Sequence, residues 1–149
     1  MPQSDHENKS LVQVKERDRT TMEAILRRNI GMMHAQDGRY QEAMAEYQTA
    51  LEIKKMFDET HREVAITLNA IGALLATKGE SAPALAHFRE ALSIFRMNSV
   101  SGFTMGDDNV NMDMDEDVAQ TKRNIELVEN TFGGRDTGLR RGGRGRGTF

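Results

Sequence analysis

The chain has 149 residues, enough for one domain, with 38% hydrophobic and 29% charged residues and no cysteine. The lack of cysteine excludes disulfides, thiolate metal sites and a cysteine nucleophile. No apolar run approaches the ~18 residues that cross a membrane, and "MPQSDHENKS" does not resemble a signal segment, so we expect a cytoplasmic protein, with the nucleus as the alternative.

Residues 1–19 are expected to form a flexible N-terminal segment ahead of a helical domain over 20–130. The boundary rests on Thr20-Thr-Met-Glu23, where a Thr side chain and a Glu three residues later can cap the first turn of a helix. The same pattern recurs at Thr60-His-Arg-Glu63. We therefore expect one helix to begin after each of these two patterns.

Two similar units follow, at about 24–57 and 65–98. Both units read as a helix, a turn and a second helix, because the glycines fall between runs with helical apolar spacing. Glycine at the turn can end a helix in the left-handed conformation at little cost. One constant shift along the chain superposes these pairs: Gly31/Gly72, Gly38/Gly79, Ala43/Ala84, Tyr47/Phe88, Ala50/Ala91, Leu51/Leu92 and Ile53/Ile94.

Small residues within the units predict how the two helices of a pair meet. Gly31 and Gly72 are expected at a close helix crossing, and an aromatic residue, Tyr47 or Phe88, is expected to fill the space beside it. The predicted fold is therefore all-α, a short solenoid of helix-turn-helix repeats with disordered termini.

This spacing resembles the tetratricopeptide repeat, in which an apolar-Gly pair is followed by Ala, an aromatic residue and Ala. The long period, which runs from Gly31 to Gly72, and the run "HREVAITLNAIGALL" are most similar to repeats of the kinesin light chain type. The pattern departs from the family where a bulky aromatic residue and a closing proline are usual. The residues that carry the resemblance are Ile30-Gly31, Ala43, Tyr47 and Ala50, then Ile71-Gly72, Ala84, Phe88 and Ala91; those that depart are Arg27, Leu68, Lys55 and Arg96.

A partial third copy begins at Glu116, where Val118-Ala119, Thr121 and Ile125 repeat Val64-Ala65, Thr67 and Ile71 with the same internal spacing. We expect an acidic loop over 99–117, a lone capping helix over 118–130 and a disordered Arg/Gly-rich tail over 131–149. These make about two and a half repeats, fewer than the ~3 usually needed for stability. Self-association, or a role as the capping fragment of a larger repeat assembly, therefore stays open.

The candidate binding site is the concave groove that the first helices of successive repeats line. Alignment of the units places two neighbouring rows on this face: Arg28, Asn69 and Arg123 in one, and Asn29, Ala70 and Asn124 in the other. The resemblance to kinesin light chain repeats implies that asparagines in these rows face a bound peptide. Amides can pair with a peptide backbone, and Arg can bind a carboxylate through two hydrogen bonds. The alternative is that these positions are merely exposed. The predicted partner-binding residues are Arg28, Asn29, Asn69, Arg123 and Asn124, for a partly acidic peptide or a partner helix.

Two further residues bear on the choice of partner. Met32 and Ala73 stand where chaperone-tail-binding repeat proteins carry their clamp residues. Neither side chain can replace a Lys or Asn clamp, because neither offers a hydrogen-bond donor. The sequence therefore argues against that specialisation.

The tail "LRRGGRGRGTF" suggests a different class of partner. Arginine planes can stack on unpaired bases and neutralise phosphates, so weak RNA contact through Arg140, Arg141, Arg144 and Arg146 is an alternative function. A plain solubilising tail is the simpler interpretation, because the tail has few aromatic residues and the rest of the chain is not basic.

No sequence feature indicates catalysis, a cofactor or a metal. The four His residues lie in unrelated contexts, and no nucleophile elbow or phosphate-binding glycine loop is present. The acidic run "GDDNVNMDMDED" lacks Gly and Glu at the positions that a calcium loop requires. We therefore predict a non-catalytic interaction module that binds a peptide or partner helix, with no enzyme activity.

Overall fold

The computed structural model describes residues 3–56, 61–101 and 110–136. The described residues form five helices and no strand, which confirms the all-α prediction. These helices are α1 (Gln3–Gln36), α2 (Tyr40–Lys55), α3 (Arg62–Thr77), α4 (Ser81–Ser101) and α5 (Val110–Asp136).

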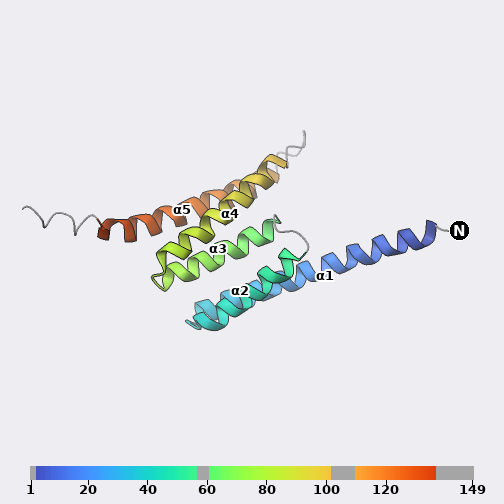
Figure 1. The fold of residues 1–149 in the computed structure, drawn as a ribbon, viewed down its shortest axis with the longest axis horizontal. Coiled ribbons are helices and arrows are strands. Elements are labelled where there is room, and N and C mark those ends of the chain that lie inside the picture. The colour runs from blue at the N-terminus through green and yellow to red at the C-terminus, as the bar shows by residue number, and fades with distance from the viewer. Residues whose placement is uncertain (1–2, 57–60, 102–109, 137–149) are drawn as a thin grey trace, which may run out of the picture.

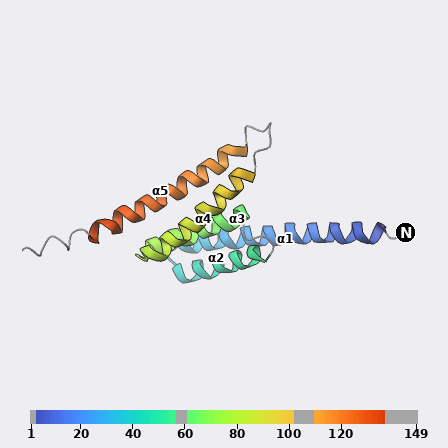
Figure 2. The ribbon, with the colours of Figure 1, turned by 45° about the horizontal axis from the view of Figure 1, so that its top comes forward.

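The helices are arranged as two hairpins and a closing helix. Helix α1 pairs with α2, α3 pairs with α4, the second hairpin stacks on the first mainly through α2 and α3, and α5 packs on α4 (Figure 1). Figure 2 shows the N-terminal part of α1 extending well past the other helices. Among the described helices, none is long and apolar enough to cross a membrane.

Each hairpin turns at a glycine in the left-handed conformation. The φ angle is 76° at Gly38 and 82° at Gly79. The turns also satisfy carbonyls at the ends of the helices: the Arg39 amide donates to the His34 carbonyl at 2.8 Å, and the Glu80 amide donates to the Leu75 carbonyl at 2.9 Å. Both predicted turns are confirmed.

The two helices of each hairpin approach closely at a glycine. A Cβ atom placed on Gly31 would lie 2.7 Å from the Tyr47 ring, and one placed on Gly72 would lie 2.7 Å from the Phe88 ring. Real Cβ atoms do not come so near to an aromatic carbon, so both positions require glycine. This confirms the predicted crossings and the role of the two aromatic residues.

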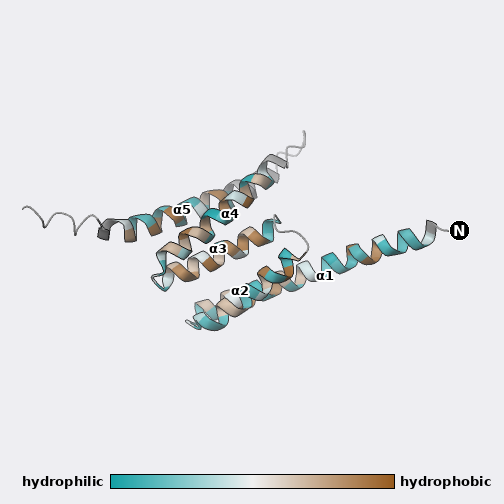
Figure 3. Cartoon of the chain, viewed as in Figure 1, coloured by the Kyte–Doolittle hydropathy of each residue, from teal (hydrophilic) through white to brown (hydrophobic). Residues whose placement is uncertain are grey.

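The core consists of two neighbouring clusters of buried side chains, and α3 contributes to both. It is the most hydrophobic of the five helices (Figure 3). The first cluster contains Ala43, Tyr47, Ile71, Leu74, Leu75, Ala84, Phe88 and Val128, and the second contains Val64, Ala65, Leu68, Ala91, Ile94 and Phe95. The first cluster combines residues from both predicted repeats and the capping helix, whereas the second is formed by α3 and α4, with Leu51 and Val118 packed against it.

The start of the helical region differs from the prediction. Helix α1 begins at Gln3, so the expectation of a flexible segment over residues 1–19 is wrong for residues 3–19. Thr20 caps nothing; its hydroxyl donates back to the Glu16 and Arg17 carbonyls at 3.0 and 2.9 Å within the helix. A threonine can bond backward inside a helix as well as cap one, and no Gly or Pro between residues 3 and 20 stops the helix earlier.

The other predicted cap shifts by one residue. His61 is the N-cap of α3, and its Nδ1 atom accepts the Glu63 amide at 3.1 Å. Thr60 lies outside the described residues. The helix therefore begins where predicted, but a histidine ring satisfies the free amide.

The C-terminal boundaries also differ from the prediction. Helix α4 continues to Ser101 and α5 begins at Val110, so most of the expected acidic loop over 99–117 is helical; residues 102–109 lie outside the described part. Helix α5 runs to Asp136, past the expected end of the capping helix at residue 130. Aspartate side chains near the start of a helix interact favourably with its dipole, which helps an acidic stretch to begin one.

Candidate functional site

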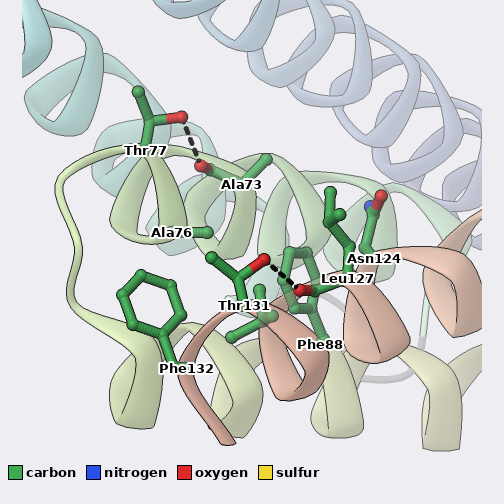
Figure 4. A pocket seen from close by; sticks show the side chains of 9 residues that line it. Ala73, Ala76, Thr77, Phe88, Asn124, Leu127, Thr131 and Phe132 are labelled. Atoms are coloured by element: carbon green, nitrogen blue, oxygen red, sulfur yellow. Dashed lines mark hydrogen bonds between the residues drawn. The ribbon is translucent and has the colours of Figure 1, made fainter. Parts of the chain in front are cut away.

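Two open hollows lie side by side on the face lined by α1, α3 and α5. The hollow between α3 and α5 has a volume of about 350 Å³ and is lined by Ala73, Ala76, Thr77, Phe88, Asn124, Leu127, Val128, Thr131 and Phe132 (Figure 4). The hollow between α1 and α3 has a volume of about 320 Å³ and is lined by Arg28, Met32, Ala35, Tyr40, Tyr47, Ala70, Ala73, Leu74 and Thr77. We call the two hollows together the groove. Ala73 and Thr77 line both, so they form the ridge between them.

Three equivalent residues run across the groove as an apolar row. Met32, Ala73 and Leu127 occupy equivalent positions in α1, α3 and α5. They directly follow Gly31, Gly72 and Glu126, which align with one another in the three copies. All three are exposed, Met32 to 46% and Leu127 to 66%. The middle residue, Ala73, has the smallest side chain, so the side chains of Met32 and Leu127 project further from the surface than the centre of the row does.

The two threonines that line the groove have no hydroxyl proton free for a ligand. The Thr77 hydroxyl donates to the Ala73 carbonyl at 3.0 Å, and the Thr131 hydroxyl donates to the Leu127 carbonyl at 2.6 Å (Figure 4). Each hydroxyl proton is therefore used inside its own helix, and neither is available to donate to a ligand.

Arg28, predicted to bind a partner carboxylate, lines the groove but already meets a carboxylate of this chain. Its guanidinium lies 3.5 Å from the Glu63 carboxylate on α3, and both side chains are largely buried. Its Nε atom is buried and makes no hydrogen bond. The pair joins α1 to α3 and reduces the positive charge that the groove presents.

Burial raises the pKa of Tyr47, which lies beside Arg28, above its ordinary value of 10.0, and the positive charge of Arg28 offsets part of this rise. The unfolded chain therefore loses the phenol proton at a lower pH than the folded chain does. We expect the free energy of unfolding to fall as the pH rises through and above 10. Urea unfolding below and above pH 10 should show a smaller loss for Tyr47→Phe than for the wild type, and equal losses would contradict this linkage.

The predicted asparagines behave differently from one another. Asn124 lines the groove, and its side-chain amide donates to the Asn69 side-chain oxygen at 3.3 Å, which joins α5 to α3. Asn29 is exposed and lines neither hollow. The structure thus brings Asn69 and Asn124 together and places Asn29 outside the groove.

Arg123 is also outside the groove. Its guanidinium bonds to Glu116 at 2.7 Å and to Gln120 at 3.2 Å, both on its own helix. The arginines predicted to contact RNA, at positions 140, 141, 144 and 146, lie outside the described residues. The residues that sequence reasoning did not assign to the site are the apolar ones, above all Leu127 and the ridge residues.

The groove offers an open, mainly apolar surface for binding. Among the described side chains, no group of three or more His, Asp and Glu residues could hold a metal ion. The lining of the two hollows is mainly apolar, with one side-chain amide, that of Asn124, which is typical of a surface that recognises side chains by shape.

The sequence was also compared with known proteins. Residues 21–97, just over half of the chain, match the family model of the tetratricopeptide repeat. No curated protein matches the chain.

Proposed function

Because the chain belongs to the tetratricopeptide repeat family, whose repeats generally mediate protein–protein interaction, we propose that it is a non-catalytic adaptor that binds its partner in the groove. The observation that carries this proposal is the apolar row of Met32, Ala73 and Leu127 across α1, α3 and α5. Exposed apolar residues gathered in a hollow are the usual mark of an interaction site.

The partner segment is proposed to be apolar rather than acidic. Each hollow can accept one large apolar side chain, and the low ridge at Ala73 and Thr77 lets the backbone of the partner pass from one hollow to the other. The Arg28 guanidinium already pairs with the Glu63 carboxylate, which partly neutralises its charge, so it attracts a carboxylate of the partner only weakly. The Asn124 amide, at the edge, can still bond to the backbone of the partner.

Two finer proposals rest on the sequence alone. The long period between Gly31 and Gly72 supports repeats of the kinesin light chain type. The Arg-Gly steps of the tail support weak RNA contact as an alternative function, for which loss of salt-dependent RNA binding on deletion of residues 135–149 is the test.

The groove can be tested without a known partner. Peptides selected from a displayed random library on the full chain should carry two large apolar residues a short distance apart. Ala73→Arg should weaken the selected peptide at least about tenfold, which corresponds to about 1.4 kcal/mol, because the long cationic side chain fills the ridge between the hollows. Fluorescence polarisation with a labelled peptide measures the effect.

A matched control is Ala86→Arg, which makes the same change at a position of α4 that lines neither hollow. This variant should bind the peptide like the wild type. Unchanged binding by Ala73→Arg, or equal weakening by both variants, would contradict recognition in the groove.

A further inference from the structure

Helix α1 carries an apolar stripe on the side that faces away from the core. The polar residues Lys15, Asp18 and Asn29 interrupt it, and its apolar members are Leu11, Met22, Leu26 and Met33, which are 58%, 69%, 60% and 62% exposed. On a helix of 3.6 residues per turn they lie within about 60° of one another, and about 180° from the buried Ala24 and Gly31. We call these four residues the outer stripe.

Part of the outer stripe lies on the portion of α1 that extends past the other helices (Figure 2). Every residue from Ser4 to Arg19 is exposed, and Figure 3 shows apolar patches on this otherwise hydrophilic part of the ribbon. Isolated helices of this length are marginal in water, because most helical stability in proteins comes from packing of one face. This half of α1 therefore lacks the packing that would stabilise it within one chain.

Equivalent positions in the other repeats show what kind of surface the outer stripe is. Leu26 corresponds to Thr67 and Thr121, which are 3% and 0% exposed. Met33 corresponds to Leu74 and Val128, which are both 4% exposed. In α3 and α5 these positions are buried against the preceding hairpin, so the outer stripe is a helix-stacking surface that nothing in the described chain covers.

The opposite end of the array does not fit this surface. Helix α5 carries Lys122, Glu126 and Glu129, all exposed, where α3 has the buried Leu68, Gly72 and Leu75. Stacking of α5 of one copy on α1 of the next would place Lys122 and Glu126 against the outer stripe, and Glu129 already pairs with Arg89 of α4 at 3.1 Å. Head-to-tail assembly of this kind would also not close.

The outer stripe is, in contrast, complementary to itself. Leu11, Met22 and Met33 are evenly spaced along α1, and each step is close to a whole number of helical turns. When two copies of α1 run antiparallel and cross at Met22, Leu11 of each copy lies opposite Met33 of the other. In the same register, Asp18 lies opposite Leu26 and Lys15 lies opposite Asn29, so no like charges meet along the stripe.

We propose that α1 is a dimerisation helix, which pairs antiparallel with α1 of a second copy along the outer stripe. In such a dimer the extended half of each α1 lies along the repeat-bearing half of the other. The interface uses the same surface on both copies, so it closes at two chains. It lies on the side of α1 opposite the core and leaves the groove open on both copies.

Sedimentation and light scattering on the full chain test the proposal. The wild type should have twice the 16.7 kDa mass of one chain at micromolar concentration. Met22→Lys should halve the mass without loss of cooperative melting, because it places two ammonium groups at the crossing point. Met56→Lys, the same change at a Met that is 80% exposed at the end of α2, should remain dimeric.

Engineered cysteines test the register, since the chain has none of its own. Under oxidation, Met22→Cys should form a disulfide-linked dimer. Leu11→Cys should link to Met33→Cys in a mixture but not to itself. A monomeric wild type, a dimer that persists in Met22→Lys, or Leu11→Cys linked to itself would each overturn the proposal; the first would mean that another protein or repeat covers the stripe.

Discussion

Gly72→Leu is expected to lower the free energy of unfolding by about 2–4 kcal/mol, the range of overpacked and strained core substitutions. The reason is geometric, because even a Cβ atom at this position would lie 2.7 Å from the Phe88 ring. Phe88 is 1% exposed and surrounded by core residues, so it cannot move aside without displacing its neighbours. Urea unfolding monitored by circular dichroism measures the change.

Two controls separate the close contact from general effects of losing a glycine. Gly133→Leu, at a helical glycine whose Cβ would meet nothing within 4 Å, should leave stability nearly unchanged. In a double-mutant cycle, Phe88→Leu should recover part of the stability lost in Gly72→Ala, because the smaller side chain makes room for the new methyl group. Additive effects in this cycle would show that the ring is not what excludes a side chain at Gly72.

Val128→Asp should be at least as damaging, with an expected loss of about 3–5 kcal/mol, the scale of an uncompensated buried charge. Val128 is 4% exposed and lies in the first core cluster with Phe88. A carboxylate there would lose its hydration without gaining a partner. Chemical unfolding at neutral pH measures the loss, which should shrink at low pH as the carboxyl group becomes protonated.

The neighbouring residue provides the matched control. Leu127→Asp makes the same kind of change one position earlier, where the side chain is 66% exposed and lines the groove. It should keep nearly wild-type stability while weakening peptides that bind in the groove. If both variants lose the same stability, α5 does not dock on α3 and α4 through the face described above.

The repeat architecture could be predicted from the sequence because its signals are local and duplicated. Gly38 and Gly79 mark turns that need a positive φ angle, and Gly31 and Gly72 mark crossings that exclude a Cβ atom. Each requirement follows from the chemistry of one residue type. Two copies at one constant offset make coincidence improbable.

The ends of the helices were harder to predict because capping residues have alternative roles. The Thr20 hydroxyl bonds within α1 instead of ending it, and a His61 nitrogen performs the capping that a threonine was expected to perform. The choice depends on whether the preceding residues remain helical. In α1 that depends on packing of its N-terminal half, which a local pattern does not contain.

The predicted site residues overlap only partly with the lining of the groove. Of the predicted residues, Arg28 and Asn124 line the groove, and Asn124, from one aligned row, contacts Asn69, from the neighbouring row. Arg28 and Met32 lie about one helical turn apart on the same face of α1, and both line the hollow between α1 and α3. Met32 and Ala73 entered the sequence reasoning only as missing clamp residues, whereas the structure places both in the lining.

The charged side of α5 also bears on how such a protein could change its length. Lys122, Glu126 and Glu129 stand where α3 uses Leu68, Gly72 and Leu75 to hold its partner helix. These three positions therefore distinguish α5 from a helix whose corresponding face packs on a following helix. We expect a duplicated hairpin inserted after α5 to pack poorly against this charged face, so that growth of the array by gene duplication would be favoured by point mutations at these three positions.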